Sequence, residues 1–260
     1  MSTEPKQSTL HIRTSDNISL AAILSTPFGK ASGAALLAHG ITVEKNEGGF
    51  YTRLATLLAR RGIQSLRFDF RGHGESGGRP QDMTINGEVQ DLIVAANYLH
   101  SLGWIRLSVV GTSFGAGIAS LAAKRKPDWI SSLVLLAPVL DYRRTFLQPE
   151  TEWASEWFTP DTLARAKATG ELDLDGFSLG YELLKEFETL NPGQVLTTLS
   201  VPTLIVHGTD DTMVPFDVAQ ELAWNCGHAR FLPIKGADHG FEDSEEIVFA
   251  EVANWILKHI

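Results

Sequence analysis

The 260-residue sequence has little of what marks secreted, membrane-spanning or disulfide-rich proteins. Cys226 is its one cysteine, so no disulfide can form within the chain, and we expect this side chain to be inert packing. The longest apolar runs, such as residues 133–140, are far too short to span a membrane as a helix. Residues 1–7 lack the apolar core of a signal peptide. These absences predict a cytoplasmic protein with no membrane span.

Basic residues are also scarce. The chain has 22 Lys and Arg against 31 Asp and Glu, which gives a formal net charge of −9. This balance disfavours nucleic acids and anionic membrane surfaces as partners. The sequence has no internal repeat and no long His and Cys clusters at metal-ligand spacing, so neither a metal nor a cofactor is expected. Its length and its 43% hydrophobic content suit one sizeable globular domain.

What is present is a regular alternation of apolar segments and helical patterns. Residues 9–13 and 18–25, joined by a polar turn, are predicted to form an antiparallel hairpin. From residue 33 onward, strands alternate with helices, which is typical of a mostly parallel sheet covered by helices on both faces. The predicted helices are residues 48–61, 84–101, 114–126, 215–225 and 244–258.

The alternation stops between residues 141 and 196, where no clear strand is found. We expect this segment to be a cap inserted into a core formed by residues 1–140 and 197–260. The segment is rich in aromatic residues, and Trp153 and Trp157 would share one face of a helix. Its aromatic side chains can form a small core of their own, a substrate wall, or both. It also carries 11 acidic and 5 basic residues, which contributes −6 of the −9 charge and disfavours polyanionic substrates such as coenzyme A thioesters.

The most informative motif is at residues 111–115, which read Gly-Thr-Ser-Phe-Gly. A strand-like segment precedes this G-x-S-x-G pattern and a helical one follows it, which is the setting of a nucleophile elbow. In such a turn the serine hydroxyl is exposed at the end of the strand, where the N-terminus of the helix favours negative charge. Ser113 is therefore the candidate nucleophile. Residues 74–78 match the same pattern but run into Arg79 and Pro80, so Ser76 is predicted to be a loop serine.

A serine becomes a good nucleophile only with a base and an acid that orients the base. An apolar strand at residues 201–206 opens into a loop that contains Asp210 and Asp211. A second strand, at residues 229–234, opens into a loop that contains His239. Both loops follow the carboxyl ends of strands, where an open α/β sheet places its site. The residues for a Ser-His-Asp triad are thus present in the order Ser, Asp, His.

These motifs resemble those of the α/β-hydrolase superfamily, and the likeness extends from about residue 10 to residue 260. It implies an eight-stranded, mostly parallel sheet with helices on both faces and an inserted cap. The superfamily's G-x-x-D-x-x-V-P loop matches here with Asp211, not Asp210, as the acid. Its G-x-x-H-G segment matches with His239 as the base.

The resemblance also implies an oxyanion hole. His39 and Gly40, directly after the predicted strand at residues 34–38, resemble the superfamily's oxyanion loop. The residue after this pair commonly donates its backbone N–H to the oxyanion, and here that residue is Ile41. The residue after the nucleophile, Phe114, would supply the second N–H.

Within the superfamily, the chain is most similar to the cinnamoyl (feruloyl) esterase branch. The likeness is carried by residues 67–70, 72–74, 82–84, 135–138, 207–211 and 236–239. In that branch a Gly-Phe-Tyr in the cap helps to hold the phenolic ring, whereas residues 176–178 here read Gly-Phe-Ser. The resemblance therefore implies hydrolysis of small to medium carboxylic esters more than of hydroxycinnamates in particular. Trp153 and Trp157 are the candidate substrate contacts.

Other functions on the same fold stay open at this point. The same triad can cleave thioesters, amides or C–C bonds, transfer acyl groups, or support a perhydrolase side activity. A non-catalytic receptor on this fold is expected to have lost a triad residue, and here the set is complete.

Overall fold

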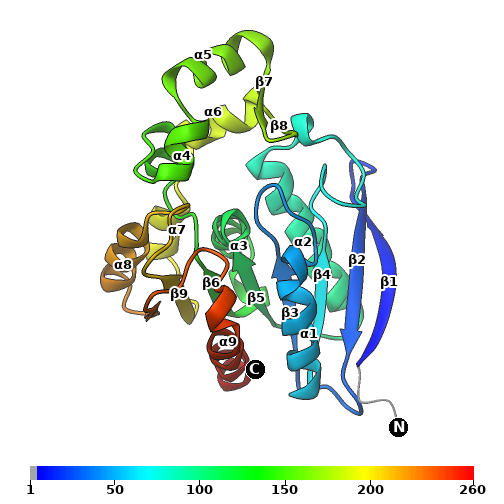
Figure 1. Ribbon diagram of the computed structural model, residues 1–260. Coiled ribbons are helices and arrows are strands. Elements are labelled where there is room, and N and C mark those ends of the chain that lie inside the picture. The colour runs from blue at the N-terminus through cyan, green and yellow to red at the C-terminus, as the bar shows by residue number, and fades with distance from the viewer. Residues whose placement is uncertain (1–4) are drawn as a thin grey trace.

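The computed structural model describes residues 5–260, in which an eight-stranded sheet lies between layers of helices (Figure 1). The strand order is β1-β2-β4-β3-β5-β6-β9-β10. β2 pairs antiparallel with β1 and β4, and all the other pairs are parallel. The predicted α/β-hydrolase sheet and its N-terminal hairpin are confirmed. The strands are β1 (Lys6–Arg13), β2 (Ser19–Thr26), β3 (Gly33–Ala38), β4 (Ile63–Phe68), β5 (Leu107–Thr112), β6 (Ile130–Leu136), β9 (Thr203–Gly208) and β10 (Ala229–Ile234).

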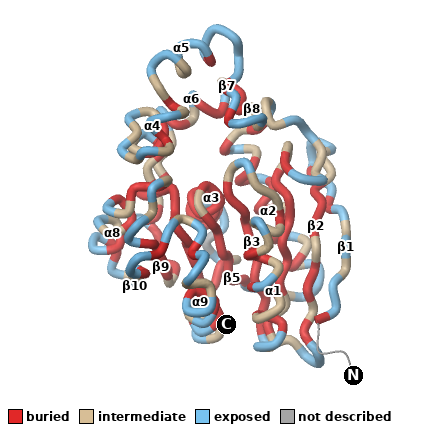
Figure 2. The backbone as a smooth tube through the Cα atoms, viewed as in Figure 1, coloured by how far each residue is buried: buried red, intermediate tan, exposed pale blue. Residues whose placement is uncertain are grey.

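Each face of the sheet packs against its own set of helices. Because successive side chains of a strand point to opposite faces, Leu36 packs in the core with α2 and α3, and Leu37 packs in the core with α1 and α9. Figure 2 shows the central strands as the most deeply buried part of the molecule. The long helices all begin and end within two residues of the predicted positions. They are α1 (Phe50–Arg60), α2 (Ile85–Ser101), α3 (Phe114–Arg125), α8 (Phe216–Asn225) and α9 (Glu245–His259).

Between β6 and β9 the chain leaves the sheet, and most of this stretch lies beyond the carboxyl ends of the central strands, at the top of Figure 1. Its last helix, residues 192–197, instead packs beside α3. The expectation that this segment has no clear strand is wrong, because β7 and β8 form an antiparallel hairpin. Its turn is Asp175-Gly176, with φ of +50° and +87°, the left-handed pair that a tight hairpin turn requires. The elements are η4 (Arg143–Leu147), α4 (Glu152–Trp157), α5 (Pro160–Thr169), β7 (Glu171–Leu174), β8 (Phe177–Gly180), α6 (Tyr181–Thr189) and α7 (Pro192–Thr197).

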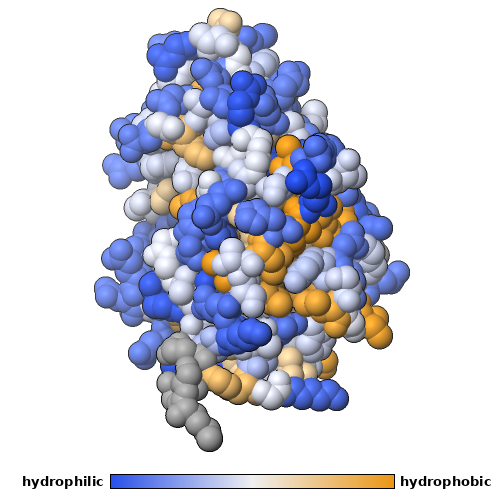
Figure 3. Space-filling view, turned by 90° about the vertical axis from the view of Figure 1, so that its right-hand side faces the viewer, coloured by the Kyte–Doolittle hydropathy of each residue, from blue (hydrophilic) through white to orange (hydrophobic). Residues whose placement is uncertain are grey.

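The aromatic side chains of this segment pack mainly on one another. The ring of Phe187 stacks on those of Phe146 and Tyr142, with centroids 4.6 and 5.3 Å apart. Phe114, the first residue of α3, lies 6.1 Å from the same ring. A small aromatic core therefore joins residues 141–196 to the start of α3. The outer surface of the molecule above it is mostly hydrophilic (Figure 3).

Two sequence-based expectations concern targeting and the cysteine. The first is the predicted absence of a membrane span: no helix in residues 5–260 has the length and apolar character needed to cross a membrane. The prediction that there is no signal core concerns residues 1–7, and residues 1–4 of these lie outside the described part of the chain. Cys226 is buried at the end of α8, and burial raises the pKa of its thiol.

Candidate active site

The chain turns sharply from β5 into α3 at Ser113. This residue has φ +53° and ψ −119°, a conformation that non-glycine residues adopt only where the surroundings enforce it. Here Ser113 N donates to Leu136 O (2.8 Å) and Ser113 O accepts from Val139 N (3.0 Å). A Cβ atom on Gly111 would lie 2.6 Å from Ala116 Cα, so only glycine fits where the strand and the helix meet. The strand–turn–helix geometry predicted for this motif is what the structure shows.

Ser76, in the second match to the motif, lies in the loop after β4. Its Oγ donates to Asp69 O (2.7 Å) and accepts from Ala21 N (2.9 Å). The Asp69 carboxylate in turn accepts from Lys45 Nζ and Glu75 N, both at 2.8 Å. The hydroxyl of Ser76 therefore ties this loop to β2 and to the end of β4, and nothing in these contacts prepares it to react.

The two predicted partners of Ser113 meet each other in the loops after β9 and β10. His239 Nδ1 lies 2.8 Å from Asp211 Oδ2. The other carboxylate oxygen, Asp211 Oδ1, accepts from Met213 N (2.8 Å) and Val214 N (2.9 Å), which fixes the orientation of the carboxylate. Asp210 is exposed and accepts only from the neighbouring threonine hydroxyl. Of the two adjacent aspartates, Asp211 is thus the one that contacts His239.

A second histidine shares the same carboxylate oxygen. His207 Nε2, at the end of β9, lies 3.0 Å from Asp211 Oδ2, and the His207 side chain is fully buried. Because a carboxylate only accepts, His207 carries its proton on Nε2. Burial opposes ionisation of Asp211, but hydrogen bonds from His207 and His239 and their electrostatic attraction hold its pKa well below the usual range. The sequence offered no signal for this contact beyond the position of His207 in the loop motif.

In the loop after β3, both backbone polar groups of Gly40 are held by hydrogen bonds to side chains. Gly40 N donates to Glu47 Oε2 (2.8 Å), and His39 Nδ1 donates to Gly40 O (2.7 Å) while His39 Nε2 accepts from Phe70 N. Burial keeps the pKa of His39 well below its usual value, so this histidine stays neutral. In a planar trans peptide the C=O and N–H point in opposite directions, so the N–H of Ile41 points away from His39.

The second predicted oxyanion donor lies beside this loop. Phe114 is the first residue of α3, so its N–H has no acceptor within the helix. A Cβ atom on Gly115 would collide with the carbonyl oxygens of Ala38 and His39, which shows how closely the end of β3 approaches the start of α3. The N–H of Phe114 and the Ile41 loop are therefore at the same end of the sheet.

A pocket of about 200 Å³ lies at this end of the sheet. It is lined by Ser113, His239 and Ile41 and, from the segment above the sheet, by Trp153. Trp157, the other candidate substrate contact, does not line this pocket and packs against the buried core. The remaining lining residues, mostly apolar, are Gly40, Thr42, Val43, Glu47, Val139, Thr145, Phe146, Met213 and Val214.

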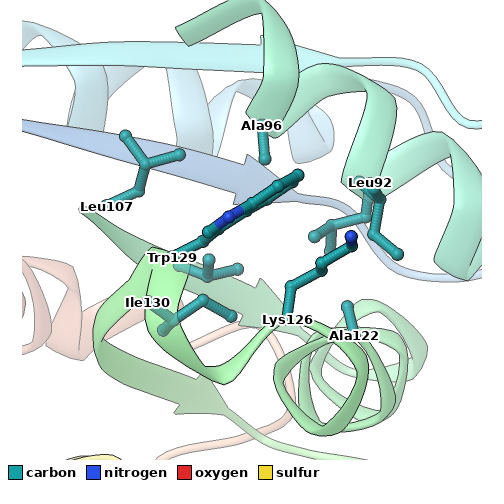
Figure 4. A pocket seen from close by; sticks show the side chains of 9 residues that line it. Leu92, Ala96, Leu107, Ala122, Lys126, Trp129 and Ile130 are labelled. Atoms are coloured by element: carbon teal, nitrogen blue, oxygen red, sulfur yellow. The ribbon is translucent and has the colours of Figure 1, made fainter. Parts of the chain in front are cut away.

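A smaller crevice lies away from this site, between α2 and α3 (Figure 4). It has a volume of about 10 Å³, and its one charged side chain, Lys126, lies 4.6 Å from the ring centre of Trp129. A crevice of that size is too small for a substrate and at most large enough for one water molecule. Among the described residues, no group of three or more His, Cys, Asp or Glu side chains is placed to hold a metal ion.

Comparison with known proteins gives a consistent assignment. The family described as "Serine aminopeptidase, S33" matches residues 29–188. The chain is 25% identical to the monoacylglycerol lipase of Mycolicibacterium smegmatis, over 90% of this chain and 91% of that protein. It is 32% identical to lipase LipV of Mycobacterium tuberculosis, over 67% of this chain and 65% of that protein.

Among solved structures, the chain is similar to Est1E from Butyrivibrio proteoclasticus with ferulic acid bound. The TM-score is 0.83 at 25% identity, and the match covers 96% of this chain and 98% of that one. The names of these relatives identify the protein as an enzyme of the ester-hydrolysing type. With a family match over more than half of its length and the sheet described above, the chain belongs to the serine aminopeptidase S33 family of α/β-hydrolases.

Proposed function

We propose that the protein is a serine hydrolase that cleaves small to medium carboxylic esters through Ser113, His239 and Asp211. One observation carries this proposal: the 2.8 Å contact between His239 and Asp211 lies at a pocket that also contains Ser113. The strained turn at Ser113 supports its role, because such turns expose a nucleophile at the start of a helix.

The proposed reaction passes through an acyl-enzyme. His239 takes the proton of Ser113 Oγ while that oxygen attacks the carbonyl carbon of the ester, and Asp211 stabilises the resulting imidazolium. The N–H groups of Ile41 and Phe114 bind the oxyanion, and each such donor typically contributes about 3 kcal/mol. The leaving alcohol takes its proton from His239. His239 then activates the water that hydrolyses the acyl-enzyme.

We propose that residues 141–196 act as a cap that sets the size of the substrate. The cap contributes Phe146 and Trp153 to the pocket, and an apolar pocket with few polar groups suits an ester with an apolar or aromatic part. The names of relatives, a monoacylglycerol lipase and Est1E with ferulic acid bound, agree with ester substrates. Residues 176–178 read Gly-Phe-Ser where the branch has Gly-Phe-Tyr, so the tyrosine is missing. The ring of Phe177 in this motif lies 4.9 Å from that of His73, and Phe177 does not line the pocket. A hydroxycinnamate is therefore not the first choice of acyl group.

A fluorophosphonate probe tests the nucleophile, because it reacts covalently with an activated serine. We expect the probe to label the wild type and Ser76→Ala but not Ser113→Ala. Hydrolysis of p-nitrophenyl butyrate should be lost in Ser113→Ala and retained in Ser76→Ala. Labelling or turnover that persists in Ser113→Ala would overturn the proposal.

A further inference from the structure

One carboxylate in the pocket has no part in the proposed triad. Glu47, just before α1, lines the 200 Å³ pocket together with Ser113 and His239. It also lines a second cavity of about 90 Å³, again together with His239. The other residues of this second cavity are Phe50, Thr112, Gly240 and Phe241. Glu47 and His239 are thus the two titratable groups that both cavities share.

The position of Glu47 is built into the fold. Its φ of +50° is in the left-handed region, which a glutamate occupies only where its surroundings hold it there. Glu47 N donates to Glu44 O (2.7 Å). Between these two residues, Lys45 N and Nζ donate to the buried carboxylate of Asp69, at 2.6 and 2.8 Å. The loop is therefore anchored to the end of β4, and this anchoring fixes the position of the Glu47 carboxylate.

The Glu47 carboxylate acts on the residue before the proposed oxyanion donor. Glu47 Oε2 accepts the N–H of Gly40, while His39 holds the carbonyl of the same residue. A Cβ atom on Gly40 would lie 3.3 Å from Ser113 Cβ and 3.4 Å from Glu47 Oε1, so the three residues are in direct proximity. With both ends of Gly40 held, the direction of the Ile41 N–H relative to Ser113 is held as well.

We propose that Glu47 is a positioning residue of the active site, which orients the Gly40–Ile41 backbone for oxyanion binding and places a titratable charge beside His239. This inference rests on the proposed function, because it assumes that Ser113 and His239 carry the reaction.

The charge of Glu47 changes in the neutral range. Burial raises the pKa of Glu47 to about 7, against the opposing effects of the Gly40 N–H and His239, and the nearby Glu44 raises it further. Tyr51, on α1, faces the same carboxylate, and burial together with the Glu47 charge raises its pKa well above the usual value. Ionised Glu47 therefore places a negative charge beside His239 in the pocket, and protonation of Glu47 removes that charge.

The test compares two substitutions of Glu47 with a matched control. Glu47→Gln keeps an oxygen that can accept from Gly40 N but removes the charge, whereas Glu47→Ala removes both. Glu246→Gln on α9 makes the same change in charge at an exposed carboxylate away from the pocket. Wild type and Ser113→Ala complete the set. For each protein, kcat and KM for p-nitrophenyl butyrate and thermal unfolding are measured from pH 5 to pH 9.

We expect Glu47→Ala to lower kcat by about tenfold or more with KM nearly unchanged, because an oxyanion donor acts in the transition state. Glu47→Gln should restore most of kcat and should change the pH profile of kcat/KM in the neutral range, because it removes the ionisation of Glu47. Glu246→Gln should leave both kcat and the pH profile unchanged. Because the pKa of Glu47 is higher in the folded state than in the unfolded state, protonation of Glu47 stabilises the fold. This stabilisation is fully present below about pH 4.5 and is lost as the pH rises through about 7. Wild type should therefore lose stability relative to Glu47→Gln across that window, and this readout needs no substrate.

Two results would overturn the role of Glu47 while leaving the proposed function intact. One is a wild-type kcat in Glu47→Ala alongside an inactive Ser113→Ala. The other is an unshifted pH profile and an unshifted unfolding profile in Glu47→Gln, which decides the matter even where Glu47→Ala does not fold. Full activity in Ser113→Ala would instead overturn the proposed function, and the present inference with it.

Discussion

At the scale of single residues, the Asp211 carboxylate is the most heavily constrained group of the site. It accepts from two histidines at Oδ2 and from two backbone N–H groups at Oδ1. Hydrogen bonds to an ionised carboxylate favour the charged form, so its low pKa keeps Asp211 ionised throughout the neutral range. Ionised Asp211 therefore contributes to the stability of the fold above about pH 4. This contribution is lost only as the pH falls through the lowered pKa that Asp211 has in the folded state.

We therefore expect Asp211→Asn to lower kcat by orders of magnitude, since an amide in this place favours the wrong tautomer of His239. The corresponding change in serine proteases costs about 10⁴ in kcat. Asp210→Asn is the matched control, because this neighbouring side chain is exposed and does not contact His239. Steady-state kinetics on one p-nitrophenyl ester measure both variants. A large loss in Asp210→Asn with little loss in Asp211→Asn would contradict the assignment.

Motif spacing and context were enough to rank neighbouring candidates from the sequence. The spacing singled out Asp211 from Asp210, and the context singled out Ser113 from Ser76. The roles of Glu47 and His207 could not be predicted in the same way. The contact of Glu47 depends on how the loop after β3 folds back on Gly40. That of His207 depends on which way a buried ring turns at the end of a strand.

At the scale of elements, the regular core was predictable because its signals are local and repeated. In α1 the buried residues recur with helical periodicity, at positions 50, 51, 54, 55, 58 and 59. α2 has an N-cap, Thr84, whose side chain accepts from Gly87 N. The hairpin of β7 and β8 was missed, although Asp175-Gly176 is a strong turn signal, because each strand has only four residues. Short strands provide too few alternating positions to stand out from a loop.

Polar contacts help to fasten the segment above the sheet to the core, in addition to the aromatic packing on Phe114. In one of them, Glu186 on α6 accepts from Ile85 N at the start of α2, where a negative charge is favoured. In another, Arg144 pairs with Asp217 on α8 at 2.8 Å. These contacts hold in place the segment whose Trp153 lines the pocket, as the proposed size-selecting wall requires.

The two tryptophans of α4 provide a test of that wall. Trp153 lines the pocket and Trp157 does not. We expect Trp153→Ala to shift the preferred acyl length upward, because it enlarges the pocket, while a minimal acetate ester is still hydrolysed. Trp157→Ala should leave the preference unchanged, although it removes a side chain of the same size. A series of p-nitrophenyl esters from acetate to decanoate measures the shift. An equal loss on every ester in both variants, with the fold intact, would mean that the cap only stabilises the protein.

At the scale of the whole molecule, the charge is unevenly distributed, and this bears on the choice between esters and thioesters. The segment 141–196 carries −6 of the net −9. Of its two adjacent arginines, Arg144 has little to offer a phosphate, because it is already paired with Glu150 at 2.6 Å and with Asp217. An excess of negative charge beside the pocket repels a polyanion such as an acyl-coenzyme A, and added salt screens that repulsion.

We therefore expect kcat/KM for p-nitrophenyl butyrate to exceed that for butyryl-coenzyme A, which carries the same acyl group. Raising the ionic strength should increase kcat/KM for the thioester and leave that for the neutral ester nearly unchanged, since only the thioester carries multiple charges. Both rates are measured with the same enzyme preparation between about 20 mM and 500 mM salt, a range over which the screening length falls several-fold. The esterase proposal would be replaced by a thioesterase one if the coenzyme A substrate were preferred by more than about tenfold, which corresponds to about 1.4 kcal/mol of transition-state stabilisation.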